Sequence, residues 1–470
     1  MYNPPATVDQ TTLPPSANGA DRAGDDAARI PGVVLAFSGG TASARVLALD
    51  GGTLELGRDS AGDGKLDDGR VSRRHATVAF ADGRFVVTDL GSQNGTFADG
   101  QVASAHAPAS FSRVLRVGDS LLVPCADVRA FERAGVRTID GFVRGPAMQA
   151  LLADVARAAR SGTILHVRGE SGTGKEGVAR TFHQASGRAN GGLVAVNCAA
   201  IPQAIAERLL FGAKKGAYSG ADADAAGYLQ EADGGTLFLD EIAELDAQVQ
   251  AKLLRALEAK EILPLGASRP RKIDLGFCSA TNKDLRALVG SGALREDLFF
   301  RIGTPAVALP PLRNRPEEIA HLVCGEIARV SPSLSAHVSL VEQCLLRPWP
   351  GNVRELIAET RAAAQAALAD GNRVTARHLS PTAGSLFGNG GSGGAPTGDT
   401  PTPNDGKRRM PAVVDDDWRR RIEEALRKQN GNIAGTARAL GLHRTQLRRL
   451  IERHGIAVGP TTDEDGDDDA

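Results

Sequence analysis

The chain has 470 residues, of which 42% are apolar and 24% charged, and its formal net charge is −1. This length allows about three domains of 100–200 residues, and the composition is ordinary for a soluble folded protein. The five cysteines are widely spaced, without a CxxC pair or a Cys/His cluster, which argues against a disulfide framework or zinc site and fits the cytoplasm. We also expect no transmembrane helix, because no run of about 18 apolar residues occurs.

Residues 1–31 are polar, with acids and prolines, and lack the apolar core of a signal peptide. We expect this segment to be disordered. Residues 32–131 instead contain short runs of alternating apolar and polar residues, such as 75–80 and 84–89, separated by Gly and Asp turns. This pattern predicts an all-β sandwich or barrel.

Three short motifs occur in order within this β-rich region. Arg58 follows Leu-Gly, Ser72 lies in Val-Ser-Arg-Arg-His, and Asn94 lies in Asp-Leu-Gly-Ser-Gln-Asn-Gly-Thr. Each is weak alone, but together they resemble the forkhead-associated (FHA) domain, a β-sandwich that binds phosphothreonine peptides through its loops. The resemblance implies that Arg58 and Ser72 bind the phosphate, that Asn94 holds the peptide backbone, and that His75 braces the loops. The implied phosphopeptide-binding residues are Arg58, Ser72, Arg73, Gln93 and Asn94. The alternative is a sandwich that has lost ligand binding.

From about residue 138 strands alternate with helical stretches, as in α/β proteins. The apolar run at residues 164–168 leads directly into a glycine-rich loop that ends in Lys175, the arrangement of a P-loop. Its backbone N–H groups can surround phosphates, and Lys175 supplies positive charge to them. Glu176 stands where the generic motif has Ser or Thr for Mg²⁺. The expected ATP-binding residues are Gly169, Glu170, Ser171, Gly172, Thr173, Gly174, Lys175 and Glu176.

A second apolar strand, at residues 236–239, ends in the acids Asp240 and Glu241. This is the Walker B pattern, in which Asp240 holds Mg²⁺ and Glu241 polarises the attacking water. Two acids at a strand end are common by chance. About 65 residues after a P-loop, a catalytic role is the better interpretation.

With these two motifs, residues 138–382 resemble the AAA+ domain of sigma-54-dependent activators, also called bacterial enhancer-binding proteins. Glutamate is usual after the P-loop lysine in that family, as Glu176 is here. The resemblance implies an α/β ATPase subdomain at residues 138–306 and a helical lid at 307–382. It also implies further site residues: Asn197, which pairs with Glu241, the sensor I pair Thr281 and Asn282, the sensor II residue Arg354, and Arg295 and Arg301, which reach the neighbouring subunit's nucleotide.

The family carries a loop that contacts sigma-54, usually Gly-Ala-Phe-Thr-Gly-Ala. Here the corresponding residues are Gly216, Ala217, Tyr218, Ser219, Gly220 and Ala221. Flanking glycines suit a mobile loop, and an exposed aromatic tip suits contact with a partner. Tyr218 adds a hydroxyl and Ser219 lacks a methyl, so the apolar contact with sigma-54 is expected to weaken.

The C-terminal part begins with a Gly/Ser/Pro/Thr-rich linker at residues 383–413. Residues 414–457 then contain three helical patterns, with a turn at Gly441, and residues 419–453 carry ten Lys/Arg against three Asp/Glu. They resemble the Fis-type helix-turn-helix, which binds double-stranded DNA as a dimer. Residues 458–470 form an acidic tail. The expected DNA-binding residues are Arg444, Thr445, Gln446, Arg448 and Arg449.

The sequence therefore predicts a multidomain cytoplasmic activator that binds an enhancer site, assembles into a hexamer and uses ATP and Mg²⁺ to remodel sigma-54 RNA polymerase. Its FHA domain would read a phosphothreonine placed on a partner protein, or on the chain itself, by a Ser/Thr kinase. Two alternatives stay open. The chain could be a phosphorylation-responsive DNA-binding regulator whose ATPase no longer opens promoters, or an AAA+ machine that acts on DNA itself.

Overall fold

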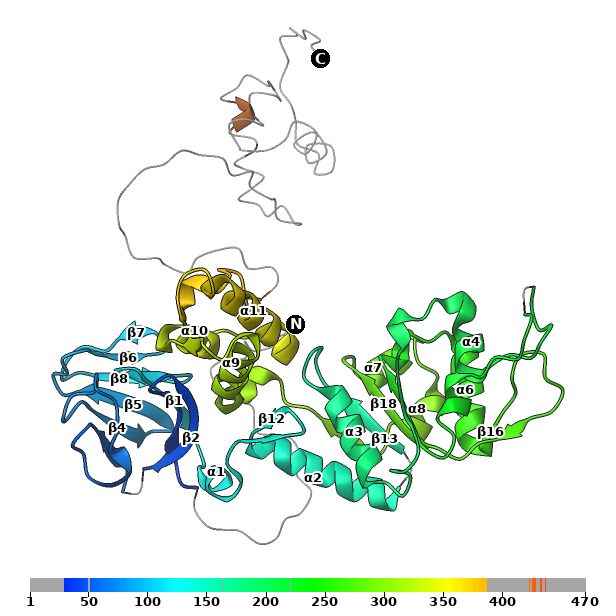
Figure 1. Ribbon diagram of the computed structural model, residues 1–470, viewed down its shortest axis with the longest axis horizontal. Helices are drawn as coiled ribbons and strands as arrows, with labels where there is room; N and C mark the ends of the chain where they lie inside the picture. Colours follow the sequence, from blue (N-terminus) through cyan, green and yellow to red (C-terminus); the bar gives the residue numbers. More distant parts are fainter. Residues whose placement is uncertain are drawn as a thin grey trace, which may run out of the picture. The chain divides into compact units, whose positions relative to one another are not determined.

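The computed structural model describes residues 29–386, apart from Asp50, Thr163 and Gly220, together with positions 422, 425–427, 432 and 436. The chain divides into two compact units, Met1–Asn389 and Gly390–Ala470. Figure 1 shows the ribbon coloured along the sequence. The predicted acidic tail, residues 387–413 of the predicted linker and most of the predicted N-terminal segment lie outside the described residues. So do the predicted DNA-binding residues Arg444, Thr445, Gln446, Arg448 and Arg449. The linker was predicted to begin at residue 383, but Ala383 is 3% exposed and belongs to the lid core.

A sandwich of two antiparallel sheets forms the first domain. The first sheet contains, in spatial order, β2 (Thr41–Ala48), β1 (Gly32–Ser38), β10 (Ser120–Cys125), β9 (Leu115–Val117), β6 (Thr96–Ala98) and β7 (Gln101–Val102). The second contains β3 (Thr53–Leu56), β4 (Ala76–Ala81), β5 (Arg84–Asp89) and β8 (Pro108–Phe111).

Alternation along the strands explains this sandwich. In β5 every second residue, starting at Phe85, is buried, as expected where one face of a strand packs on a core. Leu47, Val78, Val87 and Leu122 come from both sheets and are fully buried in that core. The predicted all-β sandwich is confirmed.

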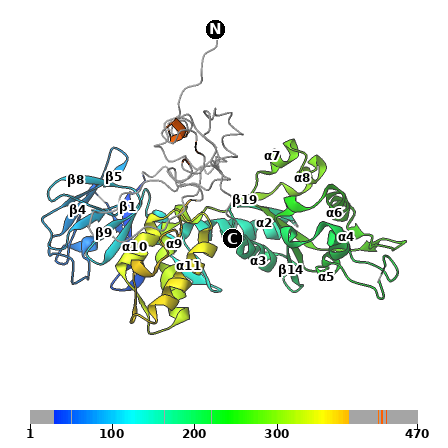
Figure 2. The ribbon, with the colours of Figure 1, turned by 90° about the horizontal axis from the view of Figure 1, so that it is seen from above.

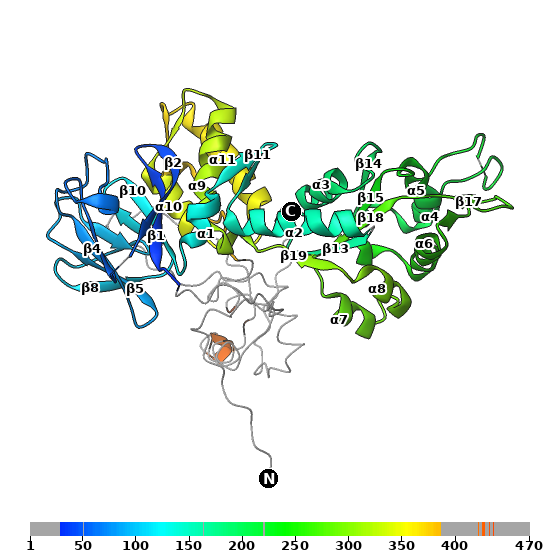
Figure 3. The same ribbon diagram turned by 90° about the horizontal axis from the view of Figure 1, so that it is seen from below.

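The segment after the sandwich ties it to the next domain. It contains α1 (Arg129–Ala134), the hairpin of β11 (Arg137–Ile139) and β12 (Phe142–Arg144), and α2 (Pro146–Ser161). Gln149 of α2 donates through Nε2 to the carbonyls of Gly135 and Arg144, each at 2.9 Å. Since these carbonyls flank the hairpin, the side-chain amide of Gln149 joins the hairpin to α2. Figure 3 shows α2 beside α1.

A five-stranded parallel sheet forms the centre of the second domain. Its strands, in spatial order, are β14 (Leu193–Asn197), β15 (Thr236–Asp240), β18 (Gly276–Thr281), β13 (Ile164–Arg168) and β19 (Ala306–Ala308). β18 is buried along its whole length, as expected of a central strand in a sheet covered by helices. The carboxyl ends of the strands meet at one edge, so the residues that follow them are brought together.

The helices that accompany this sheet are α3 (Lys175–Ala185), α4 (Gln203–Phe211), α5 (Tyr228–Glu231), α6 (Ala247–Ala259), α7 (Leu285–Gly290) and α8 (Glu296–Ile302). A small hairpin of β16 (Glu261–Ile262) and β17 (Arg271–Lys272) follows α6. The α/β prediction is confirmed. Its limit at residue 306 was wrong by two residues, because Val307 and Ala308 still pair with the end of β13.

The lid consists of three helices, α9 (Pro316–Val330), α10 (Val338–Leu346) and α11 (Asn352–Ala367), with two short strands, β20 (Ser335–Ala336) and β21 (Arg373–Val374). The helices lie together in Figure 2. Fully buried Trp349 donates from Nε1 to the carbonyl of Cys344 at 2.7 Å. Glu326 of α9, 1% exposed, accepts from Arg361 of α11 at 2.6 Å. The hydrogen bond of the Trp349 indole and the ion pair of Glu326 with Arg361 thus add to the apolar packing of the lid helices.

All five cysteines are free thiols, and Cys198, Cys278 and Cys344 are buried. Burial raises the pKa of Cys344 to about 12, so this thiol stays protonated and packs as an apolar group. Within the part of the chain that the structure describes, no helix combines the length and apolarity needed to cross a bilayer.

In the C-terminal unit, positions 422, 425–427 and 436 are helical. Ile422 and Leu426, four residues apart, are 0% and 3% exposed. Residues at that spacing lie on one face of a helix. These positions agree with a helical pattern at the start of residues 414–457.

The stability of the fold should depend on pH through Glu317 of α9. Burial, and then the adjacent Glu318 carboxylate, raise the pKa of Glu317 from 4.5 to about 7. Because the pKa of Glu317 is raised in the folded state, the contribution of this residue to the free energy of unfolding is complete below about pH 4.5. That contribution is lost as the pH rises through 7. Glu317→Gln should therefore raise the free energy of unfolding by about 1–3 kcal/mol at pH 8 and by much less at pH 5.

Urea unfolding followed by circular dichroism at both pH values measures this difference. Glu132→Gln, at an exposed position of α1, is the matched control and should change stability at neither pH. An equal gain for Glu317→Gln at both pH values would contradict the assigned pKa.

Candidate functional site

A glycine-rich loop connects β13 to α3 at the carboxyl edge of the parallel sheet. Gly172 and Gly174 have φ values of 77° and 104°, a conformation that favours glycine. A Cβ at Gly172 would also lie 2.2 Å from the carbonyl oxygen of Gly351 in the lid. The loop closes on itself through Thr173 Oγ1, which donates to the carbonyl of Glu170 at 2.8 Å. Lys175 then begins α3, so the first N–H groups of the helix are available for phosphates.

The side chain of Lys175 joins this loop to the end of β15. Its Nζ lies 2.9 Å from Glu241 Oε1, 3.3 Å from Asp240 Oδ1 and 3.4 Å from the carbonyl of Gly169. Lys175 is only 6% exposed. A charge that is this buried requires neutralising partners. The two predicted Walker B acids therefore lie together with the P-loop lysine.

Glu241 occupies a left-handed backbone conformation, with φ of 52°. Such a conformation is uncommon for a residue with a side chain and costs about 1–3 kcal/mol. The turn brings its second oxygen, Oε2, to the end of β18, where Thr281 Oγ1 and the N–H of Asn282 donate at 3.3 Å. The predicted sensor I pair is thus in contact with the predicted catalytic glutamate.

Asn197 ends β14 and lines the cavity onto which the glycine-rich loop opens. Its Oδ1 accepts from the N–H of Ala199 at 3.0 Å and caps a short 3-10 turn, Cys198–Ala200. The carboxylate of Glu241 is held instead by Lys175, Thr281 and Asn282. The expected pairing of Asn197 with Glu241 is not made in this arrangement and stays a prediction.

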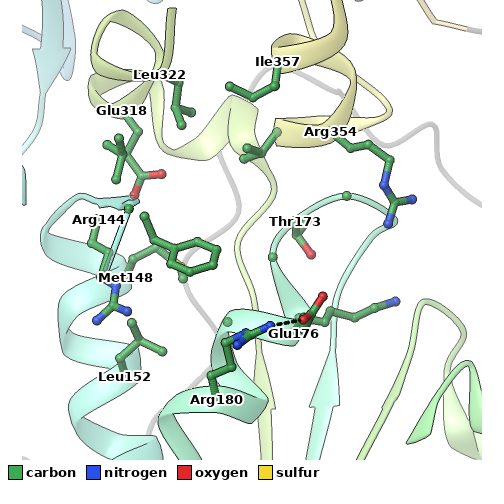
Figure 4. A pocket seen from close by; sticks show the side chains of 18 of the residues that line it. Arg144, Met148, Leu152, Thr173, Glu176, Arg180, Glu318, Leu322, Arg354 and Ile357 are labelled. Carbon is green, nitrogen blue, oxygen red and sulfur yellow. Dashed lines mark hydrogen bonds and ion pairs between the residues drawn. The ribbon is translucent and has the colours of Figure 1, made fainter. Parts of the chain in front are cut away.

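The glycine-rich loop opens onto a cavity of about 670 Å³. One end is polar, with Lys175, Asn197 and Asp240. The β11–β12 hairpin, α2 and the lid contribute apolar side chains: Phe142, Val143, Met148, Leu152, Leu322, Val353 and Ile357. Charged side chains lie among them: Arg144, Glu176, Arg180, Arg315, Glu318, Arg329 and Arg354. Figure 4 shows Met148 and Leu152 of α2 and Leu322 and Ile357 of the lid around this space. Such a cavity suits a nucleotide, whose base is apolar and whose phosphates are charged.

Mg²⁺ fits the polar end because it prefers one or two carboxylates together with substrate phosphates. Asp240 is the carboxylate placed for it beside Lys175. Glu176 pairs with Arg180, one turn further along α3, at 2.7 Å, which Figure 4 marks with a dashed line. Among the described residues no group of three or more His, Cys, Asp or Glu could hold a metal by itself.

The lid is bonded directly to the glycine-rich loop. Asn352, fully buried at the start of α11, donates from Nδ2 to Glu170 Oε2 at 3.1 Å and to the carbonyl of Ser171 at 3.0 Å. Arg354, the predicted sensor II residue, donates to Ser171 Oγ at 3.1 Å. The N–H of Val353 donates to the carbonyl of Gly172 at 3.1 Å.

The segment between sheet and lid holds the loop from a second direction. Arg313 makes two parallel hydrogen bonds to the Glu170 carboxylate, at 2.7 and 2.8 Å, and holds its pKa below the usual value. Arg315, 2% exposed, donates to the carbonyl of Thr173 at 3.2 Å and pairs with Glu318 at 2.9 Å. Sequence reasoning missed both arginines, because they look like ordinary surface residues before a helix.

The two arginines predicted to act in trans lie on α8, outside the lining of this cavity. Arg295 pairs with Asp297 at 2.7 Å and is 44% exposed. Arg301 donates to the carbonyl of Leu257 on α6 at 2.8 Å. Phe300 between them is 72% exposed. Their contact with a second subunit stays a prediction.

The predicted sigma-54 loop is a closed turn. The N–H of Gly216 donates to the carbonyl of Ala221 at 2.9 Å, and that of Ala221 to the carbonyl of Tyr218 at 3.0 Å. Tyr218 is 38% exposed, and its hydroxyl accepts from Arg208 of α4 at 2.7 Å. The hydroxyl that distinguishes Tyr218 from the usual phenylalanine therefore has a hydrogen-bond partner. Gly220 lies outside the described residues.

The predicted phosphopeptide residues gather on two neighbouring loops of the sandwich. The N–H of Arg58 donates to the carbonyl of Ser72 at 3.0 Å, and the N–H of Gln93 donates to Ser72 Oγ at 3.1 Å. Asn94 Nδ2 donates to the carbonyl of Arg70 at 2.7 Å. The side chains of Arg58 and Arg73 are exposed. The loops thus present arginines, a hydroxyl and an amide on adjoining segments.

His75 braces these loops from beneath. Its Nδ1 accepts from the N–H of Ser72 at 3.0 Å, and its Nε2 lies 3.2 Å from the carbonyl of Gly95. An accepting Nδ1 requires the neutral ring with the proton on Nε2, and burial lowers the pKa of His75, which favours that form. Asp89 accepts from Thr96 Oγ1 at 2.6 Å and from the N–H of Gly91 at 2.9 Å. Two buried side chains therefore fix the loops.

Comparison with known families divides the chain in the same order. Residues 54–123 match the FHA domain, residues 142–308 the Sigma-54 interaction domain, and residues 419–454 the Bacterial regulatory protein, Fis family. The Sigma-54 interaction domain is an AAA+ ATPase domain.

Three relatives show how far the similarity extends. The hydrogenase transcriptional regulatory protein HoxA of Bradyrhizobium diazoefficiens is 40% identical over 66% of this chain and 63% of its own. The putative uric acid sigma-54-dependent transcriptional regulator UacR of Escherichia coli K12 is 48% identical over 43% of this chain and 35% of its own. The regulatory protein AtoC of Escherichia coli K12 is 36% identical over 67% of this chain and 68% of its own.

The chain thus spans less than two thirds of HoxA and about a third of UacR, but more than two thirds of AtoC. The three domain matches follow one another in the order FHA, ATPase, helix-turn-helix. The chain therefore belongs to the sigma-54-dependent transcriptional regulators, as a member that carries an FHA domain, an AAA+ sigma-54 interaction domain and a Fis-type helix-turn-helix.

Proposed function

We propose that this protein binds an enhancer site in the cytoplasm, hydrolyses ATP and uses the hydrolysis to open promoters held by sigma-54 RNA polymerase. The observation that carries the proposal is the contact of Lys175 with both Asp240 and Glu241 beside a glycine-rich loop. The same domain presents the aromatic side chain of Tyr218 on a turn. One domain thus combines the residues for hydrolysis with a surface for sigma-54.

In the ATPase cycle, Lys175 would bind the β- and γ-phosphates of ATP and Asp240 would hold Mg²⁺, which would neutralise charge on the phosphates. Glu241 orients and polarises the attacking water, and Thr281 and Asn282 fix its carboxylate. Asn197 donates from Nδ2 to this carboxylate when the idle arrangement forms. Arg295 and Arg301 reach the nucleotide of the neighbouring subunit in a hexameric ring and stabilise the charge that develops on the transferred group.

The Tyr218 turn carries the mechanical output. Its ring is exposed, and its hydroxyl is bonded to Arg208 on α4. During the ATPase cycle the exposed ring presses on sigma-54. The hydrogen bond also favours a second candidate: a regulator whose ATPase no longer opens promoters, because the ring is held against its own domain.

The FHA domain provides the input. Arg58, Ser72, Arg73, Gln93 and Asn94 lie on loops that His75 and Asp89 fix in position. The Arg58 guanidinium and the Ser72 hydroxyl, on two bonded segments of the β3–β4 connection, match the oxygens of a phosphothreonine. We infer that a Ser/Thr kinase supplies the phosphothreonine, on a partner or on this chain. The helix-turn-helix, bound as a dimer through Arg444, Thr445, Gln446, Arg448 and Arg449, keeps the hexamer near its promoter.

The bond between the lid and the glycine-rich loop should set ATP affinity. Glu170→Ala removes the acceptor for both Arg313 and Asn352 and should raise KM for ATP about three- to tenfold, with a smaller change in kcat, since the pair is partly exposed. Arg313→Ala should do the same, and the double variant should lose no more than either alone. Steady-state hydrolysis measures both constants. Asp154→Ala, which breaks the exposed pair with Arg157, is the control.

Tyr218→Ala should separate hydrolysis from promoter opening. We expect ATP turnover within about twofold of wild type and loss of open complexes in transcription with purified sigma-54 polymerase, because the ring lies outside the nucleotide cavity. Tyr218→Phe keeps the ring and should retain open complexes. If the wild-type protein turns over ATP without forming open complexes at a bound promoter, the second candidate is correct.

Arg58→Ala should abolish phosphothreonine capture. Loss of a charge-assisted pair of hydrogen bonds should weaken binding by about 100-fold. Pull-downs from kinase-treated and phosphatase-treated lysates measure the capture, with Arg84→Ala, an exposed arginine on β5, as the control. Equal capture by Arg58→Ala and wild type would show that this arginine does not bind the phosphate.

A further inference from the structure

The FHA domain and the ATPase lid share one hydrophobic core. Phe37 of β1, Leu121 and Val123 of β10, and Val114 are each at most 3% exposed. They belong to the same buried cluster as lid residues that include Val323, Ile327, Val338, Leu345 and Ala363. A face of the sandwich therefore packs on α9 and α10 in the manner of a domain interior.

Polar contacts fix this FHA–lid contact in register. Arg116 of β9 bonds Glu342 of α10 through Nε at 3.0 Å, and its guanidinium also lies 3.5 Å from the centroid of the Phe97 ring. Glu342 is only 7% exposed. Arg113 donates to the carbonyl of Leu346, at the end of α10. Because Glu342 is buried, its carboxylate requires Arg116 as a partner, and removal of the guanidinium would leave a desolvated charge.

Helix α9 connects the FHA–lid contact to the nucleotide cavity. His321 Nε2 donates to the carbonyl of Ser43 in β2 at 3.2 Å. Glu318 and Leu322 of the same helix line the cavity. One helix thus contacts both the FHA domain and the site proposed for ATP.

The FHA domain reaches the α/β side of that cavity through α1, the helix that directly follows the sandwich. Helix α1 contacts β2 of the sandwich and α2 of the α/β subdomain, and Gln149 of α2 bonds the carbonyl of Gly135, the residue after α1, at 2.9 Å. Met148 and Leu152, on the same helix, line the cavity. The FHA domain is therefore attached both to the α/β subdomain and to the lid, the two parts between which the cavity lies.

The loops for the phosphopeptide reach the FHA–lid contact through a few bonds. Asn94 bonds the carbonyl of Arg70, whose side chain lies 3.6 Å from Asp119. Asp68 Oδ2 accepts from the N–H of Asp119 at 2.7 Å and from Ser120 Oγ at 2.9 Å. Ser120 begins β10, which carries Leu121 and Val123 into the shared core.

We propose that the FHA domain restrains the lid against the α/β subdomain and so slows the release of nucleotide. Release from a cavity between two subdomains requires them to separate, and a third domain attached to both opposes that separation. Loss of the FHA–lid contact then speeds release. This restraint does not depend on the proposed phosphothreonine sensing. Only the use of the restraint to pass a phosphothreonine signal to the ATPase rests on that proposed function.

The test is the dissociation rate of a fluorescent ADP analogue from the full-length protein, measured by stopped flow. Arg116→Glu and Glu342→Arg each place like charges across the contact and should speed dissociation about five- to twentyfold. The double variant restores an ion pair and should return the rate to within about twofold of wild type. Arg84→Glu makes the same charge change on an exposed part of the sandwich and should leave the rate unaltered.

Hydrogen exchange gives a second readout. By reciprocity, ADP should slow exchange in β1 and β2 of wild type, and not in Arg116→Glu. Wild-type dissociation rates in both single variants, or a double variant as fast as the singles, would overturn the restraint. Neither sigma-54 nor a phosphopeptide is present in these assays, so failure of the proposed promoter opening or phosphothreonine capture would leave their outcome unchanged.

Discussion

A buried ammonium group governs the organisation of the ATPase domain. Lys175 is 6% exposed, and a charge in that position is stable only with carboxylates beside it. Asp240 and Glu241 supply them from the end of β15. The contact joins the glycine-rich loop after β13 to the end of β15, two strands away in the sheet. Glu241 makes it from a left-handed backbone conformation. The position of Thr281 and Asn282 then follows, because they bond the other oxygen of Glu241.

The sequence allowed the fold class of each domain to be predicted, for two physical reasons. Alternating residues in β5 and the continuous apolar run of β18 are direct consequences of one-sided and two-sided burial. Residues that act at strand ends, such as Asn197, Asp240 and Thr281, could be assigned to one site because parallel strands end at one edge. The limit of the α/β subdomain was less certain, since β19 is a short strand with exposed residues.

Contacts between distant segments could not be predicted from the sequence. Arg116 and Glu342 are 226 positions apart, and each looks like an ordinary surface residue. Glu170 and Arg313 are separated by 143 positions, and neither lies in a pattern that indicates the other. Arg208 likewise gives no sign that it bonds the hydroxyl of Tyr218. Such pairs depend on how the domains pack, and packing is set by the whole core rather than by any local spacing.

At Asn352, the hydrogen bonds and the backbone conformation together limit which amino acids the position can accept. Its Nδ2 donates to Glu170, Ser171 and Pro350, its Oδ1 accepts from the N–H of Leu312, and its backbone φ is 52°. Aspartate would tolerate the backbone but has no N–H to donate, and glycine would tolerate it but make none of these bonds. Glutamine offers the same groups one carbon too far away. Nearly every single-codon change here is therefore expected to be lost by selection, while exposed Arg84 is free to drift.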